Sequence, residues 1–394
     1  MPDPGSPAHR SASGLGRLAD VETPRLVLDR GKLDLNLARM RARAEALGVA
    51  LRPHLKTAKS VEVARLAVDP LRPRLTVSTL KEAEAFAAAG WRDILYAVGI
   101  APNKVEHAAR IRRDGTQLSL ILDSVEAARA LGEAAGRLGV RFAVMIEIDT
   151  DGHRAGVKPA DPRLVEVARA VATSPALELK GVMTHAGASY DCRSLDAIAD
   201  MAETERSGAV AAADAIRAAG LPCPEVSVGS TPTALMARAL AGVTEFRPGV
   251  YMFHDLVMAG LGVCRPEDVA VSVLATVIGH QAEKRWLITD GGWMALSRDR
   301  GTAAQNLDQG YGVVCSEAGE ILADVLVTGA NQEHGIVAAR PGTPALDLAR
   351  FPIGTRLRVL PNHACATAAQ HGGYLVVGAD GVTIEAEWPR LNGW

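Results

Sequence analysis

Lys56 has the sequence setting of a lysine nucleophile. It lies in the segment Leu51–Ser60, LRPHLKTAKS, just beyond the end of a predicted β-strand and between His54 and Thr57. A lysine in such a setting can be desolvated, which favours the neutral amine that attacks carbonyl carbons. A surface lysine after a strand is the simpler interpretation, so the assignment depends on where the chain places its other polar residues.

Other predicted strands also end in polar side chains. The turn Gly229–Thr231 is small, rich in hydroxyl groups and opens a helix, so its free N–H groups suit a phosphate dianion. A reactive lysine and an anion-binding turn together indicate a phosphorylated aldehyde cofactor, and pyridoxal 5′-phosphate is the common one. Taken singly, the turn can be an ordinary helix N-cap and His185 a hydrogen-bonded core residue. The candidates at these strand ends are His54, Arg154, His185, Tyr190, Gly229, Ser230, Thr231 and Tyr251.

A candidate metal pair lies near the C-terminus. His363 and Cys365 are separated by one residue in PNHACAT, and on an extended segment this spacing points both side chains to one face, as two ligands of one cation require. Two residues are a weak signal, because water, substrate or another ligand must complete the shell. Burial of Cys365 is the alternative. A second polar cluster, NQEH, supplies candidates for substrate contact or support of the metal pair, or plain loop residues: Gln332, Glu333 and His334.

Short apolar runs and Ala-rich helical segments alternate in the first two thirds of the chain. Strands buried on both faces and joined through helices form a parallel sheet, and this pattern predicts a (β/α)8 TIM-type barrel, with a doubly wound open sheet as the alternative. The predicted strands are 49–53, 74–78, 93–98, 117–122, 141–148, 177–184, 225–228 and 243–247. The predicted helices are 32–47, 61–68, 81–89, 103–113, 125–138, 162–173, 195–219 and 234–240.

After about residue 269 the pattern changes to strands separated by Gly and Pro turns, which predicts a β-rich second domain. The expected strands are 271–278, 285–289, 321–328, 335–339, 356–360, 374–377 and 382–387. We therefore expect a disordered tail over 1–22, a strand over 23–30 that joins the second domain, a barrel over 31–268, and a β-domain with the metal site over 269–394.

Composition excludes several functional classes. The chain has 394 residues with 43 basic and 45 acidic side chains, so no surface for nucleic acid is indicated. Its five cysteines are scattered, as in a reduced cytoplasmic protein. No apolar run reaches the roughly 18 to 20 residues of a membrane span.

Seven motifs in this order resemble the D-serine dehydratase and D-threonine aldolase family. They are RPHLKTAKS, EIDTDGHRAGV, THAGASY, VSVGSTPT, RPGVYMF, NQEHG and PNHACAT, and the resemblance covers essentially 24–394. It implies an alanine-racemase-like fold, pyridoxal 5′-phosphate, a divalent ion such as Zn, Mn or Mg, and a homodimer. One departure is Ala58, where the family motif PHxKTHK commonly has histidine.

The resemblance also implies roles for the candidate residues. Lys56 resembles the lysine that binds the cofactor covalently, and Arg154 the arginine beside its phenolic oxygen. The turn 229–231 and Tyr251 resemble the phosphate site, while His363 and Cys365 resemble the metal pair. Dehydratases of the family tend to have His-x-Cys at this pair and aldolases His-x-Asp, so Cys365 favours dehydration.

The expected reaction is elimination of water from β-hydroxy D-amino acids. D-threo-3-hydroxyaspartate would yield oxaloacetate and ammonia, and D-serine would yield pyruvate and ammonia. The alternative is retro-aldol cleavage to glycine and an aldehyde, with His185 as the base. A racemase with Tyr311 as a second base is a further hypothesis, as is a non-catalytic pyridoxal-binding protein, although the β-domain argues against the latter.

Overall fold

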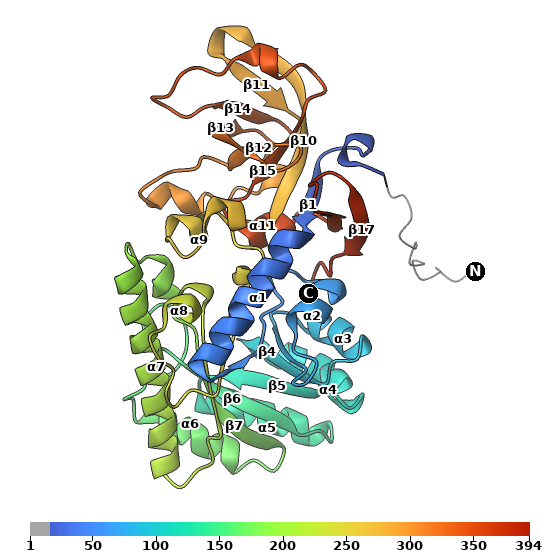
Figure 1. Cartoon of the computed structure of the whole chain (residues 1–394). Coiled ribbons are helices and arrows are strands. Elements are labelled where there is room, and N and C mark those ends of the chain that lie inside the picture. Colours follow the sequence, from blue (N-terminus) through green and yellow to red (C-terminus); the bar gives the residue numbers. More distant parts are fainter. Residues whose placement is uncertain (1–15) are drawn as a thin grey trace, which may run out of the picture.

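Eight parallel strands alternate with helices in the larger domain of the computed structural model, which describes residues 16–394 (Figure 1). Their order in the sheet is β2-β9-β8-β7-β6-β5-β4-β3. The bounds are β2 Ala50–Leu51, β3 Arg74–Val77, β4 Asp93–Gly99, β5 Gln117–Leu122, β6 Phe142–Ile148, β7 Leu177–Thr184, β8 Glu225–Val228 and β9 Glu245–Phe246.

Backbone hydrogen bonds close this sheet into a barrel. The N–H of Leu55 donates to the carbonyl of Thr76 at 2.8 Å, and the N–H of Thr76 donates to the carbonyl of Pro53 at 2.9 Å. These bonds join the segment after β2 to β3, the two ends of the sheet order. The expected (β/α)8 barrel is therefore confirmed, and the doubly wound open sheet is wrong.

Helices cover the outside of the barrel and lie close to their predicted bounds. Several begin at a Ser or Thr N-cap, such as Thr79, Ser124 and Ser194, which accepts a backbone N–H three residues later. The helices are α1 Arg30–Leu47, α2 Val61–Ala67, α3 Leu80–Ala88, α4 Val105–Arg113, α5 Val125–Arg137, α6 Arg163–Ala172, α7 Leu195–Ala218 and α8 Thr231–Met236. A further short helix that we did not predict, α9 Leu256–Gly260, packs Leu256 against the β-domain. The predicted bounds 234–240 are wrong, because Ser230 caps α8 by accepting the N–H of Thr233, so the helix begins at Thr231.

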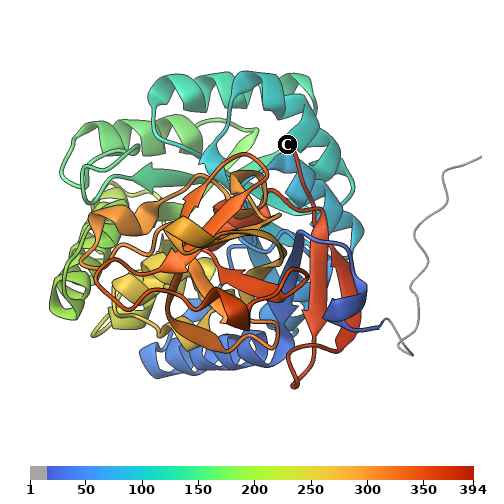
Figure 2. The same cartoon turned by 90° about the horizontal axis from the view of Figure 1, so that it is seen from above.

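The second domain is a nine-stranded, mostly antiparallel sheet with the order β11-β14-β13-β12-β15-β10-β1-β16-β17, closed by pairing of β10 with β11. Seen from above, it lies over the barrel (Figure 2). Its elements are β1 Arg25–Asp29, β10 Val271–Gln281, β11 Trp286–Thr289, α10 Trp293–Leu296, β12 Val313–Ser316, β13 Ile321–Ala330, β14 Gly335–Ala339, β15 Arg356–Leu360, α11 Ala364–Ala368, β16 Gly373–Val377 and β17 Ile384–Pro389. Strand β12 is absent from our prediction.

The N-terminal strand belongs to this β-domain. Strand β1 pairs with β10 antiparallel and with β16 parallel, and α1 then leads the chain into the barrel. Residues 1–15 of the tail that we expected to be disordered lie outside the described residues. Residues 16–22 do not fit that expectation, because Leu18 is fully buried against Val27 and Leu375. Within 16–394, no helix is long and apolar enough to cross a membrane.

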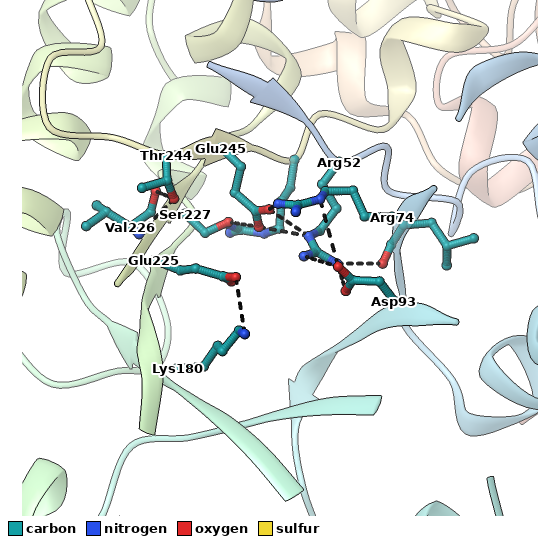
Figure 3. A network of polar contacts seen from close by, with 11 residues as sticks. Arg52, Arg74, Asp93, Lys180, Glu225, Val226, Ser227, Thr244 and Glu245 are labelled. Carbon is teal, nitrogen blue, oxygen red and sulfur yellow. Dashed lines mark hydrogen bonds and ion pairs between the residues drawn. The ribbon is translucent and has the colours of Figure 1, made fainter. Parts of the chain in front are cut away.

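A network of buried charges fills the end of the barrel where the strands begin (Figure 3). Arg52 donates to both carboxylate oxygens of Glu245 at 2.9 Å and to Asp93 at 2.8 Å. Arg74 donates to Glu245 at 3.0 Å. Burial would lower the pKa of Arg52, but the two carboxylates outweigh this effect and raise it. The network therefore closes the strand-start end of the barrel with paired charges.

Replacing Glu245 by alanine should destabilise the fold strongly. Glu245 is fully buried, so its loss leaves the guanidinium of Arg52 desolvated with one weaker partner. Breaking a buried pair in this way costs about 3–5 kcal/mol. Urea unfolding of Glu245→Ala should show this loss. Glu225→Ala is the matched control at the start of β8, because Glu225 and Lys180 are partly exposed and 3.8 Å apart, and it should cost about 1 kcal/mol or less. Equal losses would contradict the prediction.

Candidate functional site

Lys56 lies in a tight turn at the opposite mouth of the barrel, immediately after the first barrel strand. The N–H of Lys59 closes the turn by donating to the carbonyl of Leu55 at 2.7 Å. The N–H of Lys56 points to Nδ1 of His54 at 3.4 Å. The Lys56 side chain is exposed, so the expected desolvation is wrong: the turn carries the side chain out of the barrel core.

Two histidines lie within the electrostatic influence of Lys56. Burial, and next the charge of Lys56, lowers the pKa of His54 and brings that of His185 to about 3. Both imidazoles are therefore neutral near pH 7. Nδ1 of His185 lies 3.1 Å from the carbonyl of Gly229, which can only accept, so Nδ1 carries the proton and Nε2 is a free acceptor. The structure thus brings His54 and His185 together with Lys56.

Tyr190 and Arg154 extend this group. The ring of Tyr190 lies 6.2 Å from that of His185, and burial followed by the nearby Cys365 raises the pKa of its hydroxyl. Arg154 is exposed and pairs with Glu147 at 3.3 Å. Its charge also contributes to the lowered pKa of His185, so both loops reach the mouth near Lys56.

Unpaired backbone N–H groups follow β8 and β9. Those of Thr231, Gly249 and Val250 are buried and have no acceptor among residues 16–394. Buried N–H groups rarely lack an acceptor, so three of them at neighbouring strand ends fit a bound anion. A Cβ on Gly249 would lie only 2.8 Å from the carbonyl of His54, so a side chain there would collide with the Lys56 segment.

These donors differ from the set that the sequence suggested. The N–H of Gly229 donates to Glu205 at 3.0 Å, and that of Ser230 donates to Thr233 at 3.0 Å, so neither is free for a ligand. Thr231 remains a candidate. Our interpretation missed Gly249 and Val250 as donors, and the glycine three residues after the end of the eighth strand was the signal that could have identified them.

Tyr251 directly follows Val250, one of the residues with an unpaired N–H group. It is 1% exposed, and its hydroxyl has no hydrogen-bond partner among the described residues. Burial raises the pKa of this hydroxyl, and the charge of Arg41 on α1 opposes the effect. The tyrosine is linked to the anion site through its backbone, because its N–H donates to Oγ1 of Thr231 at 3.2 Å.

His363 and Cys365 lie at the start of α11. His363 is the N-cap and Cys365 is inside the helix, so the expected extended segment is wrong. The two side chains are nevertheless neighbours, since each affects the pKa of the other. Sγ of Cys365 lies 3.2 Å from Oγ1 of Thr57, the residue after Lys56. This contact joins the β-domain pair to the lysine turn.

His363 and Cys365 stabilise opposite charges on each other. Burial would lower the pKa of His363, but the hydrogen bond with Asp299 and the Cys365 thiol raise it to about 11. Burial would raise the pKa of Cys365, but His363, Lys56 and the Thr57 hydroxyl lower it. Nδ1 of His363 lies 2.7 Å from Asp299, so the hydrogen bond with Cys365 involves the other ring nitrogen, Nε2. A divalent cation would displace the His363 proton, and a thiolate and a neutral imidazole nitrogen are good ligands for it.

The pair stands without a third strong ligand in the described part of the chain, where no group of three or more His, Cys, Asp or Glu side chains could hold a metal ion. Water or substrate oxygens would have to complete its coordination. Sequence reasoning missed Asp299, which orients His363, and Asp255, which accepts the N–H of Ala364 at 3.0 Å. Neither carries a local sequence signal, because both reach α11 from distant segments.

The NQEH cluster lies in the exposed turn between β13 and β14. Its backbone supports α10, since the N–H groups of Trp293 and Met294 donate to the carbonyls of Asn331 and Gln332 at 2.9 and 3.1 Å. Helix α10 in turn accepts the hydroxyl of Thr367 in α11 at 2.8 Å. The side chains of Gln332, Glu333 and His334 are exposed, so their connection to the metal pair runs through the backbone of α10.

Comparison with known families divides the chain as the structure does. The family described as "Alanine racemase, N-terminal domain" matches residues 28–256, and the family described as "Putative serine dehydratase domain" matches residues 270–377.

Similar proteins cover almost the whole chain. A D-threo-3-hydroxyaspartate dehydratase of Delftia sp. (strain HT23) is 55% identical over 96% of this chain and 99% of its own. A D-serine dehydratase of Dictyostelium discoideum is 30% identical over 95% and 98%. A 3-hydroxy-D-aspartate aldolase of Paracoccus denitrificans (strain Pd 1222) is 28% identical over 94% and 92%. Among solved structures, a cysteine-to-alanine variant of D-threo-3-hydroxyaspartate dehydratase in the metal-free form is 54% identical, with a TM-score of 0.93 and coverage of 96% and 100%.

Proposed function

Because the chain belongs to the D-serine dehydratase and D-threonine aldolase family, we propose that it is a lyase that removes water from β-hydroxy D-amino acids with pyridoxal 5′-phosphate and a divalent metal ion. The preferred substrate is D-threo-3-hydroxyaspartate, which yields oxaloacetate and ammonia. The 3.2 Å contact between Thr57 and Cys365 carries the proposal, because it brings the lysine turn and the metal pair to one mouth of the barrel.

The residues present fit the cofactor. Lys56 offers an exposed amine for its aldehyde carbon, and the N–H groups of Thr231, Gly249 and Val250 offer buried donors for its phosphate. When bound, pyridoxal 5′-phosphate supplies an electron sink for the negative charge that develops at the substrate Cα. Arg154 is our candidate for the group beside the phenolic oxygen, since its charge reaches His185 at the same mouth.

Lys56 is also our candidate for the proton carrier. When its amine is free, Lys56 would take the Cα proton from the side on which it lies. The neutral His54 and His185 beside it do not compete as bases for this proton, because their pKa values lie below the usual range of histidine. The proton is therefore held on the lysine nitrogen.

The metal pair faces the departing hydroxyl group in this proposal. His363, through Nε2, and the thiolate of Cys365 would hold the cation, which supplies Lewis acidity toward a poor leaving group. Asp299 fixes the His363 ring through Nδ1, so Nε2 points away from the carboxylate. Thr57 holds the Cys365 sulfur beside the lysine turn.

Weak basicity of His185 supports elimination over retro-aldol cleavage. The aldol course needs a base that takes the β-hydroxyl proton, and His185 was the candidate. With a pKa of about 3, this histidine is a weak base. The expected homodimer and the cytoplasmic location stay predictions.

Product analysis tests the proposal. The purified enzyme with bound cofactor should release ammonia and oxaloacetate from D-threo-3-hydroxyaspartate, and ammonia and pyruvate more slowly from D-serine. D-threonine should give 2-oxobutyrate and ammonia rather than glycine and acetaldehyde. Release of glycine without ammonia from these substrates would show that the enzyme is an aldolase and not a dehydratase. Loss of the substrate's optical activity without release of ammonia would show that the enzyme is a racemase.

A further inference from the structure

The three residues that follow Lys56 are held by the β-domain. Each of their consecutive carbonyl groups accepts one hydrogen bond from that domain. The three bonds are Arg390 Nη2 to the carbonyl of Thr57 at 3.4 Å, Tyr374 Oη to that of Ala58 at 2.5 Å, and the Leu391 N–H to that of Lys59 at 2.6 Å. The backbone of the lysine turn is therefore bound by the other domain.

These donors come from one rigid part of the β-domain. Tyr374 lies on β16, which pairs with β17, and Arg390 and Leu391 directly follow β17. Strand β16 also pairs with β1 inside the sheet. The Tyr374 side chain is buried with its ring against Phe253, 5.6 Å between centroids. Burial raises its pKa to about 12, so the hydroxyl keeps its proton to donate at neutral pH.

The turn has one backbone hydrogen bond of its own, from the N–H of Lys59 to the carbonyl of Leu55 at 2.7 Å. Lys56 is exposed, and its N–H reaches His54 only at 3.4 Å. Lys59 has a φ of +44°, in the left-handed region that residues with a Cβ disfavour. Because a strained turn persists only where its surroundings hold it, the contacts from the β-domain determine where the Lys56 amine lies.

The same domain also holds the metal pair. Oγ1 of Thr57 contacts Cys365 of α11, and the carbonyl of Thr57 accepts from Arg390. The side chain of Thr57 thus contacts the thiol of Cys365, and its backbone carbonyl is bound by Arg390. Any shift of the turn relative to the β-domain changes the separation of the Lys56 amine from Cys365.

We propose that Tyr374 and Arg390 are positioning residues, which hold the carbonyls of the lysine turn and so fix the Lys56 amine relative to the metal pair. The inference rests on the proposed function, which assigns Lys56 and Cys365 to one reaction. Neither residue needs to contact substrate or cofactor for this role.

The test compares Tyr374→Phe with the matched control Tyr96→Phe, both in the enzyme with bound cofactor. Each variant removes one hydroxyl from a fully buried tyrosine, and among the described residues the Tyr96 hydroxyl is hydrogen-bonded only to Lys104, at 3.4 Å. Misplacement of a reacting group by about 1 Å can cost roughly 100-fold in rate. We expect kcat of Tyr374→Phe to fall about 10- to 100-fold with KM within about twofold, and the control to stay within about twofold.

A second measurement does not depend on turnover. In the cofactor-free chain, hydrogen exchange of the backbone amides of residues 55–59 should accelerate in Tyr374→Phe and stay unchanged in Tyr96→Phe. A merely structural loss would lower the unfolding temperature of both variants without this local difference.

The outcomes separate the two proposals. If Tyr374→Phe matches Tyr96→Phe in kcat and in exchange, the positioning role is wrong. If Tyr374→Phe does not fold, Arg390→Met removes the neighbouring donor and must show the same effects in weaker form. If the wild type does not convert β-hydroxy D-amino acids, the proposed function fails, while the exchange result still decides whether the β-domain holds the turn.

Discussion

Replacing Lys56 by alanine should abolish turnover and the visible absorbance of the protein-bound cofactor together. The alanine variant loses both the amine that holds the aldehyde and the group that carries the Cα proton. Loss of these two roles should lower kcat by roughly 10⁴-fold or more. The measurements are steady-state ammonia release and the absorbance spectrum after incubation with pyridoxal 5′-phosphate.

Two lysine-to-arginine variants sharpen this result. Lys56→Arg keeps the positive charge that acts on His54, His185 and Cys365, but a guanidinium is always protonated and cannot act as the nucleophile. It should be as inactive as Lys56→Ala. Lys59→Arg keeps the ion pair with Glu82, 3.0 Å away in the native chain, and should stay active. Turnover that survives in Lys56→Ala would remove Lys56 from the mechanism.

Replacing Cys365 by alanine should separate metal binding from cofactor binding. The thiol is one of two side chains available to the cation, so metal content should fall and kcat should drop at least about 100-fold. The cofactor absorbance should persist, because Lys56, Thr231 and Gly249 are untouched. Metal analysis of the dialysed protein and ammonia release are the measurements.

Cys223→Ala is the control for a buried cysteine far from the pair. Cys223 is 3% exposed and lies between α7 and β8, so its variant should keep metal and activity. A chelator should reduce the wild type to the level of Cys365→Ala, and added divalent ion should restore only the wild type. If a chelator leaves the wild type fully active, the metal role of His363 and Cys365 is wrong.

Most barrel strands could be predicted because their side chains are buried on both faces. Such strands are nearly continuous apolar runs, and the bounds expected for β5, β7 and β8 agree with the structure to the residue. Short elements beside the site were harder. Helix α8 begins where a Ser230 and Thr233 capping box forms, and α11 occupies a segment that we expected to be extended. At such lengths, caps and tertiary contacts outweigh local propensity.

Only part of the candidate site could be predicted from residue types. Lys56, His185, His363 and Cys365 could be selected because few side chains perform nucleophilic, basic or metal-binding chemistry. Asp299 could not, since its partner His363 is 64 positions away in the chain. We overestimated the Gly229 amide as a phosphate donor, because its acceptor Glu205 comes from the distant helix α7.

The sequence by itself determined the order of strands and helices, the family, and the kinds of chemistry at the strand ends. Only the tertiary structure decided that Thr57 meets Cys365 across 308 positions, and that the β-domain holds the carbonyls after Lys56. It also decided which backbone N–H groups are free and which thiol has a lowered pKa. The reason is physical: hydrogen-bond satisfaction and desolvation depend on the groups packed around an atom, and at this site those groups come from segments far apart in the chain.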